Sequence, residues 1–165
     1  MNDEFWYALY TRPRHEKKVL HELSRKGVDA FLPTFKVRRR WSDRYKIVEE
    51  PLFKNYVFVN IDFDRCHYGT LRPYGAVSFV TFDGIPSRIP AIEIGAIRRL
   101  VESELPYHPH PYLKIGRGVR VRSGPLVGCE GVLMRKKGIA RLVLSVNLLR
   151  QSVSAEVDAD SVETI

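Results

Sequence analysis

Two runs of apolar and aromatic residues, each next to a charged segment, predict strands at residues 5–11 and 51–61. Side chains of a strand point alternately to its two faces. In the second segment one face is aliphatic and the other aromatic, with Val57, Val59 and Ile61 opposite Tyr56 and Phe58. The aliphatic face suits a hydrophobic core. The aromatic face suits either a core or a docking surface.

Apolar residues recur at the helical period in residues 13–26, which predicts a helix that Pro13 opens and Gly27 ends. A second amphipathic helix is predicted from Pro90 onward, with the buried positions Ile94, Ile97, Leu100 and Val101. A short helix at residues 62–71 and a strand at residues 76–82 are predicted between them. Strands alternating with amphipathic helices indicate a sheet with helices packed on it, an α/β sandwich.

Residues 31–48 are predicted to form a long hairpin with Ser42 and Asp43 near its tip. Basic and apolar side chains alternate along both arms. The loop length decides how the two basic rows combine, because one residue of register moves every side chain to the other face. A three-residue loop aligns the basic rows on one face, whereas a two-residue loop mixes them with apolar positions. The sequence leaves both registers open.

The last third of the chain has a different character. Residues 105–112 carry three prolines in eight positions and are predicted to be a linker. From residue 113 onward, short β-branched runs separated by glycine-bearing turns are typical of a small barrel. Residues 139–150 fit either a strand or an amphipathic helix. We therefore expect an amino-terminal domain at residues 1–104, a linker, and a second domain at residues 113–165.

Composition excludes several classes of protein. The 165 residues are 44% hydrophobic and 28% charged, which fits a folded chain. No apolar run reaches the roughly 18 residues of a membrane span, and the acidic start is not that of a signal peptide. Cys66 and Cys129 are too few for a disulfide framework or a zinc cluster. We expect a reduced, cytoplasmic setting and no membrane partner.

Catalytic and metal-binding patterns are also missing from the sequence. His15 and His21, each followed by glutamate, are six residues apart, whereas the helical zinc-protease motif needs a spacing of four. His108 and His110 have no further ligand close in sequence, so they are interpreted as linker residues. We expect neither an enzyme nor a cofactor or metal site.

Positive charge is concentrated in one part of the chain. Residues 12–46 hold twelve Lys or Arg and four acids, so they account for the whole net charge of +8. Such a local field favours a polyanionic partner. The residues predicted to contact phosphates are Arg12, Arg14, Lys17, Lys18, Arg38, Arg40 and Arg44. Trp41 and Tyr45, near the hairpin tip, are candidates for stacking on exposed bases.

Two sequence motifs carry a family resemblance. WYALYT, followed by RPRHEKKV and later by PLFKNYVFV, resembles the amino-terminal (NGN) domain of NusG transcription elongation factors. KIGRGVRVRSGPLVGCEGVL resembles the KOW motif that opens the carboxy-terminal, five-stranded SH3-like barrel of that family. FLPTFKVRRRWSDRYKIVEEPLF and RLVLSVNLL look most like the specialised RfaH- and UpxY-type antiterminators. The resemblance implies an α+β chain with an antiparallel amino-terminal sheet.

The same resemblance implies a factor that suppresses pausing and termination by RNA polymerase. Its contacts to the clamp helices of the beta-prime subunit, and to the opposite side of the polymerase cleft, are expected at Tyr10, Tyr56, Phe58 and His67. Upstream or non-template DNA, or nascent RNA, is the expected polyanion. A ribosomal protein or termination factor is expected on the KOW barrel of a monomeric chain.

Two other interpretations remain open. A ribosome-associated or general RNA-binding protein would bind through the basic turn formed by Arg135, Lys136 and Lys137. Alternatively, the chain is the housekeeping NusG of its host rather than a specialised paralogue.

Overall fold

The computed structural model describes residues 3–165, and they divide into two compact units. The first unit runs from the described start of the chain to Thr34 and from Phe53 to Ala91. The second comprises Phe35–Leu52 and Ile92–Ile165.

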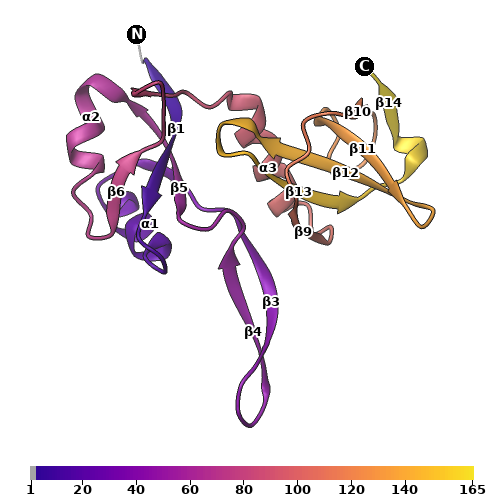
Figure 1. The fold of residues 1–165 in the computed structure, drawn as a ribbon, viewed down its shortest axis with the longest axis horizontal. Coiled ribbons are helices and arrows are strands. Elements are labelled where there is room, and N and C mark those ends of the chain that lie inside the picture. Colours follow the sequence, from indigo (N-terminus) through magenta and orange to yellow (C-terminus); the bar gives the residue numbers. More distant parts are fainter. Residues whose placement is uncertain (1–2) are drawn as a thin grey trace. The chain divides into compact units, whose positions relative to one another are not determined.

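The first unit is built on a four-stranded antiparallel sheet of order β2-β5-β1-β6 (Figure 1). Its strands are β1 (Glu4–Thr11), β2 (Asp29–Phe31), β5 (Tyr56–Asp62) and β6 (Ala76–Phe79). Its helices are α1 (Glu16–Arg25) and α2 (Phe63–Thr70), and a small hairpin follows as β7 (Thr81–Phe82) and β8 (Ile85–Pro86). The two predicted strands are the neighbours β1 and β5, although β5 begins at Tyr56 rather than at Pro51. They pair from Glu4 opposite Asp62 to Tyr10 opposite Tyr56.

Helix α1 begins at Glu16, later than the predicted start at Pro13. Arg14 has φ 64°, in the left-handed region that a right-handed helix cannot use, so the chain turns there before the helix starts. The end agrees with the prediction, because Gly27 adopts φ 77° just beyond the helix. The loop thus leaves Arg12 and Arg14 outside the helix.

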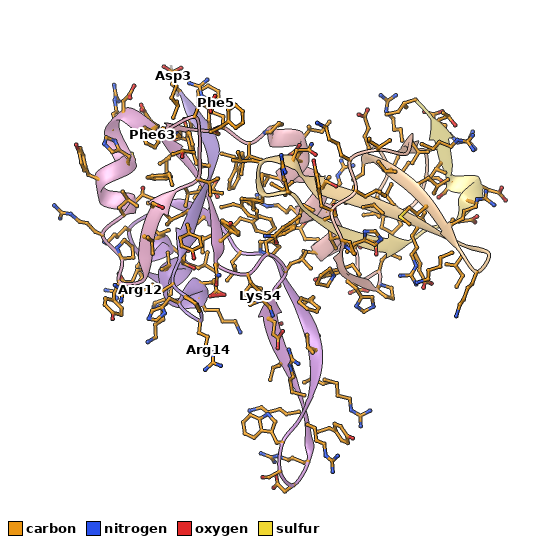
Figure 2. The ribbon with its side chains drawn as sticks, in the orientation of Figure 1. Asp3, Phe5, Arg12, Arg14, Lys54 and Phe63 are labelled. Carbon is orange, nitrogen blue, oxygen red and sulfur yellow. The ribbon has the colours of Figure 1, made fainter. Side chains whose placement is uncertain are left out.

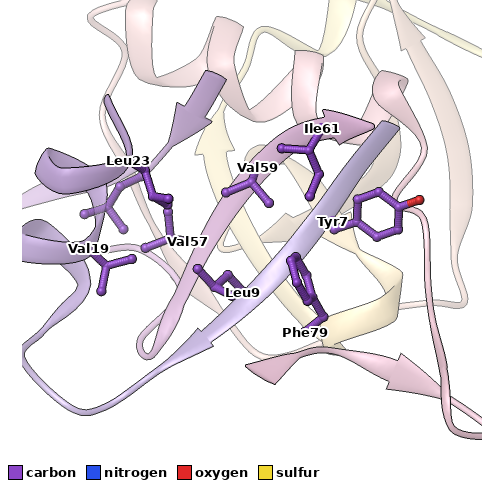
Figure 3. Close-up of a cluster of buried hydrophobic side chains, with 9 residues drawn as sticks. Tyr7, Leu9, Val19, Leu23, Val57, Val59, Ile61 and Phe79 are labelled. Atoms are coloured by element: carbon purple, nitrogen blue, oxygen red, sulfur yellow. The ribbon is translucent and has the colours of Figure 1, made fainter. Parts of the chain in front are cut away.

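The aliphatic face of β5 is confirmed as core (Figure 3). Val57, Val59 and Ile61 pack with Tyr7 and Leu9 of β1, and helix α1 covers them with Val19 and Leu23. Phe63 at the start of α2 packs against the same cluster. Both helices of the first unit therefore cover this face of the sheet.

Strands β3 (Thr34–Arg40) and β4 (Tyr45–Pro51) form the predicted hairpin as a two-stranded sheet. The backbone N–H of Trp41 donates a 2.7 Å hydrogen bond to the carbonyl of Arg44, so the loop has two residues. This closure places even-numbered side chains of β3 on the same face as odd-numbered ones of β4. The basic rows are therefore mixed with aromatic and aliphatic positions on both faces.

The rest of the second unit contains a six-stranded antiparallel sheet of order β14-β10-β11-β12-β13-β9. Its strands are β9 (Tyr107–His110), β10 (Arg117–Val121), β11 (Glu130–Lys136), β12 (Ile139–Val146), β13 (Gln151–Glu156) and β14 (Val162–Thr164). Short 3₁₀ turns, η1 (Asn147–Leu149) and η2 (Ala159–Ser161), connect the last strands. The segment from residue 139 is thus a strand rather than a helix as far as Val146.

One expectation for this part of the chain needs correction. Residues 113–165 contain the five expected strands, β10 to β14, but the predicted linker contains a further strand, β9, which pairs with β13 and adds a sixth strand to the sheet. Pro109 is tolerated because β9 is an edge strand, where a missing N–H removes no ladder bond to a second neighbour. Proline-rich composition therefore indicated a linker where the structure has an edge strand.

Helix α3 (Ala91–Glu102) starts where the sequence predicts and lies almost wholly in the second unit. The Glu93 carboxylate accepts a 2.7 Å hydrogen bond from the side-chain amide of Asn147. The Arg99 guanidinium donates to the carbonyl of Val127. These contacts group α3 with the carboxy-terminal sheet in the second compact unit.

Candidate functional site

The tyrosines predicted to contact a partner are brought together by the pairing of β1 and β5. Tyr10 and Tyr56 are direct cross-strand partners, and their ring centroids are 5.8 Å apart. Tyr10 is 37% exposed and Tyr56 is partly exposed. We call these two residues the tyrosine pair. They form an aromatic surface at the end of the sheet where β5 begins.

Burial, followed by the neighbouring Tyr10, raises the pKa of Tyr56 above its ordinary value of 10.0. The Tyr56 hydroxyl is therefore neutral across the physiological range. A neutral phenol offers one donor and an acceptor beside an apolar ring, which suits a partner with both apolar and polar groups.

Phe58, the third aromatic residue expected to contact the polymerase clamp helices, has no exposed surface. Its ring meets Phe53 edge-on at 5.8 Å and lies 6.3 Å from Phe31 on the neighbouring strand β2. Phe58 is therefore an interior residue in this structure. The alternation of side chains correctly put Tyr56 and Phe58 on one face, but it did not reveal that only the first reaches solvent.

The basic residues predicted to contact phosphates in the first unit are all exposed: Arg12 and Arg14 lie in the turn between β1 and α1, and Lys17 and Lys18 lie in the first turn of α1. Arg12 is held by Tyr74, whose hydroxyl accepts a 3.3 Å hydrogen bond and whose ring lies 5.4 Å from the guanidinium carbon. Figure 2 shows Arg12 and Arg14 together at this end of the unit.

Sequence reasoning missed two residues near this turn. Tyr74 contacts both Arg12 and the ring of His15, and it precedes Gly75, whose carbonyl accepts a hydrogen bond from the Arg12 backbone. Lys54 is exposed beside Asn55, whose carbonyl bonds to Thr11. Asn55 has φ 71°, a left-handed turn position that the lysine–asparagine dipeptide before a strand could have signalled.

His67 lies on α2 and is tied to its own helix. Its Nδ1 donates a 2.6 Å hydrogen bond to the Phe63 carbonyl, and its ring stacks on Phe63 with centroids 4.8 Å apart. In the neutral ring this leaves Nε2 as the acceptor. Tyr68, next to it, is exposed and touches the imidazole.

The basic residues predicted on the hairpin, Arg38, Arg40 and Arg44, are all exposed. The guanidinium of Arg38 lies 4.1 Å from the centroid of the Tyr45 ring, and the ammonium of Lys46 lies 4.6 Å from that of Trp41. These contacts join each tip aromatic to a cation. The hairpin belongs to the second unit, whereas Arg12 and Arg14 belong to the first.

The basic turn of the carboxy-terminal sheet joins β11 to β12. Arg135, Lys136 and Lys137 are exposed, and Lys137 and Gly138 have φ 51° and 78°. Two successive left-handed residues are typical of the type I′ turn of a tight hairpin. The three cations therefore project from the end of a β-ribbon.

Within residues 3–165, no group of three or more His, Cys, Asp or Glu side chains is placed to hold a metal ion. None of the helices over the same residues is both long and apolar enough to cross a membrane.

Comparison with known proteins decides the family. A family model described as "Transcription termination factor nusG" matches residues 4–98, more than half of the 165 residues. The chain belongs to the NusG family. It is therefore a member of a family of transcription termination and antitermination factors, as the two sequence motifs had indicated.

Full-length relatives of this NusG-family chain agree. The transcription termination/antitermination protein NusG of Lactococcus lactis is 24% identical over 183 residues, which cover 99% of this chain and 94% of that protein. The protein of the same name from Helicobacter pylori is 23% identical over 174 residues, covering 97% and 98%. A solved structure described as "Domain interaction in Thermotoga maritima NusG" has a TM-score of 0.56 at 23% identity and covers 99% of this chain and 98% of its own. The fold class is thereby confirmed.

Proposed function

We propose that this chain binds RNA polymerase through the tyrosine pair and acts as an elongation and antitermination factor. The observation that supports the proposal is the cross-strand contact of Tyr10 and Tyr56, two partly exposed rings 5.8 Å apart. Aromatic side chains of this kind are preferred anchors of protein interfaces. The partner implied by the family resemblance is the pair of clamp helices of the beta-prime subunit, and helices commonly bind in apolar grooves.

Phe58 has a different role in this proposal. Its buried ring supports the strand that carries Tyr56, because it fills the space between Phe53 and Phe31. His67, with Nε2 available as an acceptor, is proposed to contact the opposite side of the polymerase cleft. Contacts on both sides would favour the closed, actively elongating polymerase over the open, paused form. Only such a difference in affinity shifts the balance between the two forms.

The basic turn at Arg12 and Arg14, with Lys17 and Lys18, is proposed to contact upstream or non-template DNA. Exposed cations supply affinity that depends on salt and little on sequence. We further propose that residues 1–104 form the polymerase-binding domain and that the barrel recruits a second partner. The resemblance of residues 31–53 and 141–149 to the RfaH- and UpxY-type antiterminators favours a specialised paralogue over a housekeeping factor.

The test compares polymerase binding by the parent chain, the Tyr10→Ala/Tyr56→Ala double variant, and Phe82→Ala. Phe82 is 70% exposed on β7, which makes it a matched exposed aromatic outside the site. Loss of an interface anchor weakens binding by roughly 5- to 150-fold, whereas the control should bind like the parent. Single-round transcription should show a parallel loss of pause suppression. Unchanged affinity of the double variant for polymerase would exclude the proposal.

A second candidate function is RNA binding through the turn of Arg135, Lys136 and Lys137. Its support is the exposure of three consecutive cations on a ribbon end. Replacing all three by glutamine should abolish RNA binding under this alternative and leave polymerase binding intact. Retained RNA binding by that variant would exclude it.

A further inference from the structure

The tip of the β3–β4 hairpin exposes large aromatic side chains that no core explains. Trp41 is 47% exposed and Tyr45 57% exposed. A two-stranded ribbon has no interior in which to bury them, and such ribbons are only marginally stable alone. Each exposed ring is instead covered by a cation, Lys46 over Trp41 and Arg38 over Tyr45.

The two-residue loop puts these pairs on opposite faces of the ribbon. Arg38 and Tyr45 lie on one face, and Trp41 and Lys46 lie on the other, because the closing Trp41–Arg44 hydrogen bond sets that parity. Each face of the tip therefore carries one flat ring with one cation beside it. We call this arrangement the two-faced tip.

The cations of the tip are not cancelled by nearby acids. Arg39 forms a 2.6 Å ion pair with Glu50 and is thereby neutralised. The other bases within residues 38–46 are Arg38, Arg40, Arg44 and Lys46, against the single acid Asp43. The tip thus combines excess positive charge with two exposed rings, which is the pairing that single-stranded nucleic acids require of a binding surface.

We propose that the two-faced tip binds single-stranded nucleic acid, with unpaired bases stacked on Trp41 and Tyr45. Arg38 and Lys46 then leave the rings and contact the phosphates on either side of the stacked bases. Single strands are favoured over duplex because the faces of paired bases are already stacked. A ribbon that reads duplex uses hydrogen-bonding side chains on base edges.

This inference rests on the proposed function for its setting, because a transcribing polymerase exposes both unpaired DNA and emerging RNA. The shared chemistry is an unpaired base on a phosphodiester chain. DNA and RNA strands of the same sequence are therefore tested separately, and the tighter binder identifies the source.

The binding test uses the full chain with a mixed-sequence 12-nucleotide DNA strand, the matching RNA strand, and the 12-base-pair DNA duplex. Trp41→Leu and Tyr45→Leu remove the rings and keep the charges. Each should weaken single-strand binding by about 5- to 150-fold and leave the salt dependence unchanged. Arg38→Gln should instead lower the slope of log affinity against log salt by about 0.7. Phe82→Leu is the matched aromatic control and should bind like the parent.

A spectroscopic test reports stacking directly. Trp6 and Trp41 are the two tryptophans of the chain, so Trp6→Phe leaves Trp41 as the sole tryptophan fluorophore. Stacked bases should quench it on titration with either single strand, and the duplex should not. The inference would be overturned if the ring variants bound single strands with the affinity of the parent, or if they lost as much affinity for the duplex. Unquenched Trp41 fluorescence on titration with single strands would also overturn it.

A final measurement separates this inference from the proposed function. Trp41→Leu should keep full affinity for polymerase free of nucleic acid, since that binding is assigned to Tyr10 and Tyr56. Loss of polymerase binding in the tyrosine variants with intact oligonucleotide binding supports both assignments. If neither tyrosine matters for polymerase but Trp41 still governs oligonucleotide binding, the proposed function fails and the two-faced tip stands.

Discussion

Replacing Phe58 by alanine removes a side chain that has no exposed surface and lies between two other rings. The ring meets Phe53 at 5.8 Å and Phe31 at 6.3 Å, and each such contact contributes about 0.5–1.5 kcal/mol beyond burial. Together with the cavity left behind, a buried Phe→Ala change costs about 3–5 kcal/mol. For a chain of this size that lowers the melting temperature by roughly 6–20 °C.

The neighbouring Tyr56→Ala should behave differently, although Tyr56 is only two residues away on the same face. Its ring is partly exposed and its main aromatic contact is Tyr10, so the loss should be about 1 kcal/mol, or roughly 2–4 °C. Polymerase affinity should depend on the two positions in the opposite way at a temperature where all variants are folded. Tyr56→Ala should reduce the affinity, whereas the conservative Phe58→Leu should retain most of it.

Differential scanning calorimetry and far-ultraviolet circular dichroism on parent, Phe58→Ala, Phe58→Leu and Tyr56→Ala provide the measurement. The expected order of melting temperatures is parent, Tyr56→Ala, Phe58→Leu and then Phe58→Ala. A Phe58→Ala variant that melts within about 2 °C of the parent would show that the ring is not packed as described. The same variant with native stability but lost polymerase affinity would return Phe58 to the docking surface.

Three further predictions concern other parts of the chain. Cys66 is exposed and Cys129 is buried, and burial raises the pKa of the Cys129 thiol above 9.0. A disulfide reagent should therefore modify Cys66 in the native chain and Cys129 only on unfolding. Rapid modification of the native Cys66→Ser variant would contradict this. Gly131→Ala would put a Cβ 2.5 Å from a carbonyl oxygen of the neighbouring strand. Overpacking of this kind should lower the free energy of unfolding, measured in urea, by about 1–3 kcal/mol. Unchanged stability would show that the sheet adapts to the extra methyl group. Burial raises the pKa of Glu93 above its ordinary 4.5. The contribution of Glu93 to the free energy of unfolding is therefore complete below pH 4.5 and declines as the pH rises through the folded-state pKa. Glu93→Gln should flatten this decline, and a pH profile of stability identical to that of the parent would refute the prediction.

The recognition of the family and of most elements depended on local pattern alone. Apolar, aromatic-rich runs identified β1 and β5, period-two alternation identified the aliphatic core face of β5, and helical spacing identified α3. Glycine at residue 27 correctly marked the end of α1, because its left-handed conformation stops a helix. These features are encoded within a few neighbouring residues, so the sequence is sufficient for them.

Features that depend on contacts between distant residues needed the structure. Proline content predicted a linker at residues 105–112, but pairing with β13 makes part of it an edge strand. The helix start at Glu16 depended on the left-handed turn at Arg14, which no single residue type announces. Local composition limits the conformations that a segment can adopt, whereas the strand or helix that it pairs with selects one of them.

The candidate site divides in the same way. The sequence by itself determined the family, the positive charge of residues 12–46, and the alternation that puts Tyr56 and Phe58 on one face. Only the tertiary structure decided that Tyr56 meets Tyr10 at the surface while Phe58 is buried, and that the hairpin closes with a two-residue loop. The physical reason is that alternation along a strand fixes only the face to which each side chain points. Its exposure and the cross-strand register depend on which side chains, distant in sequence, pack against that face.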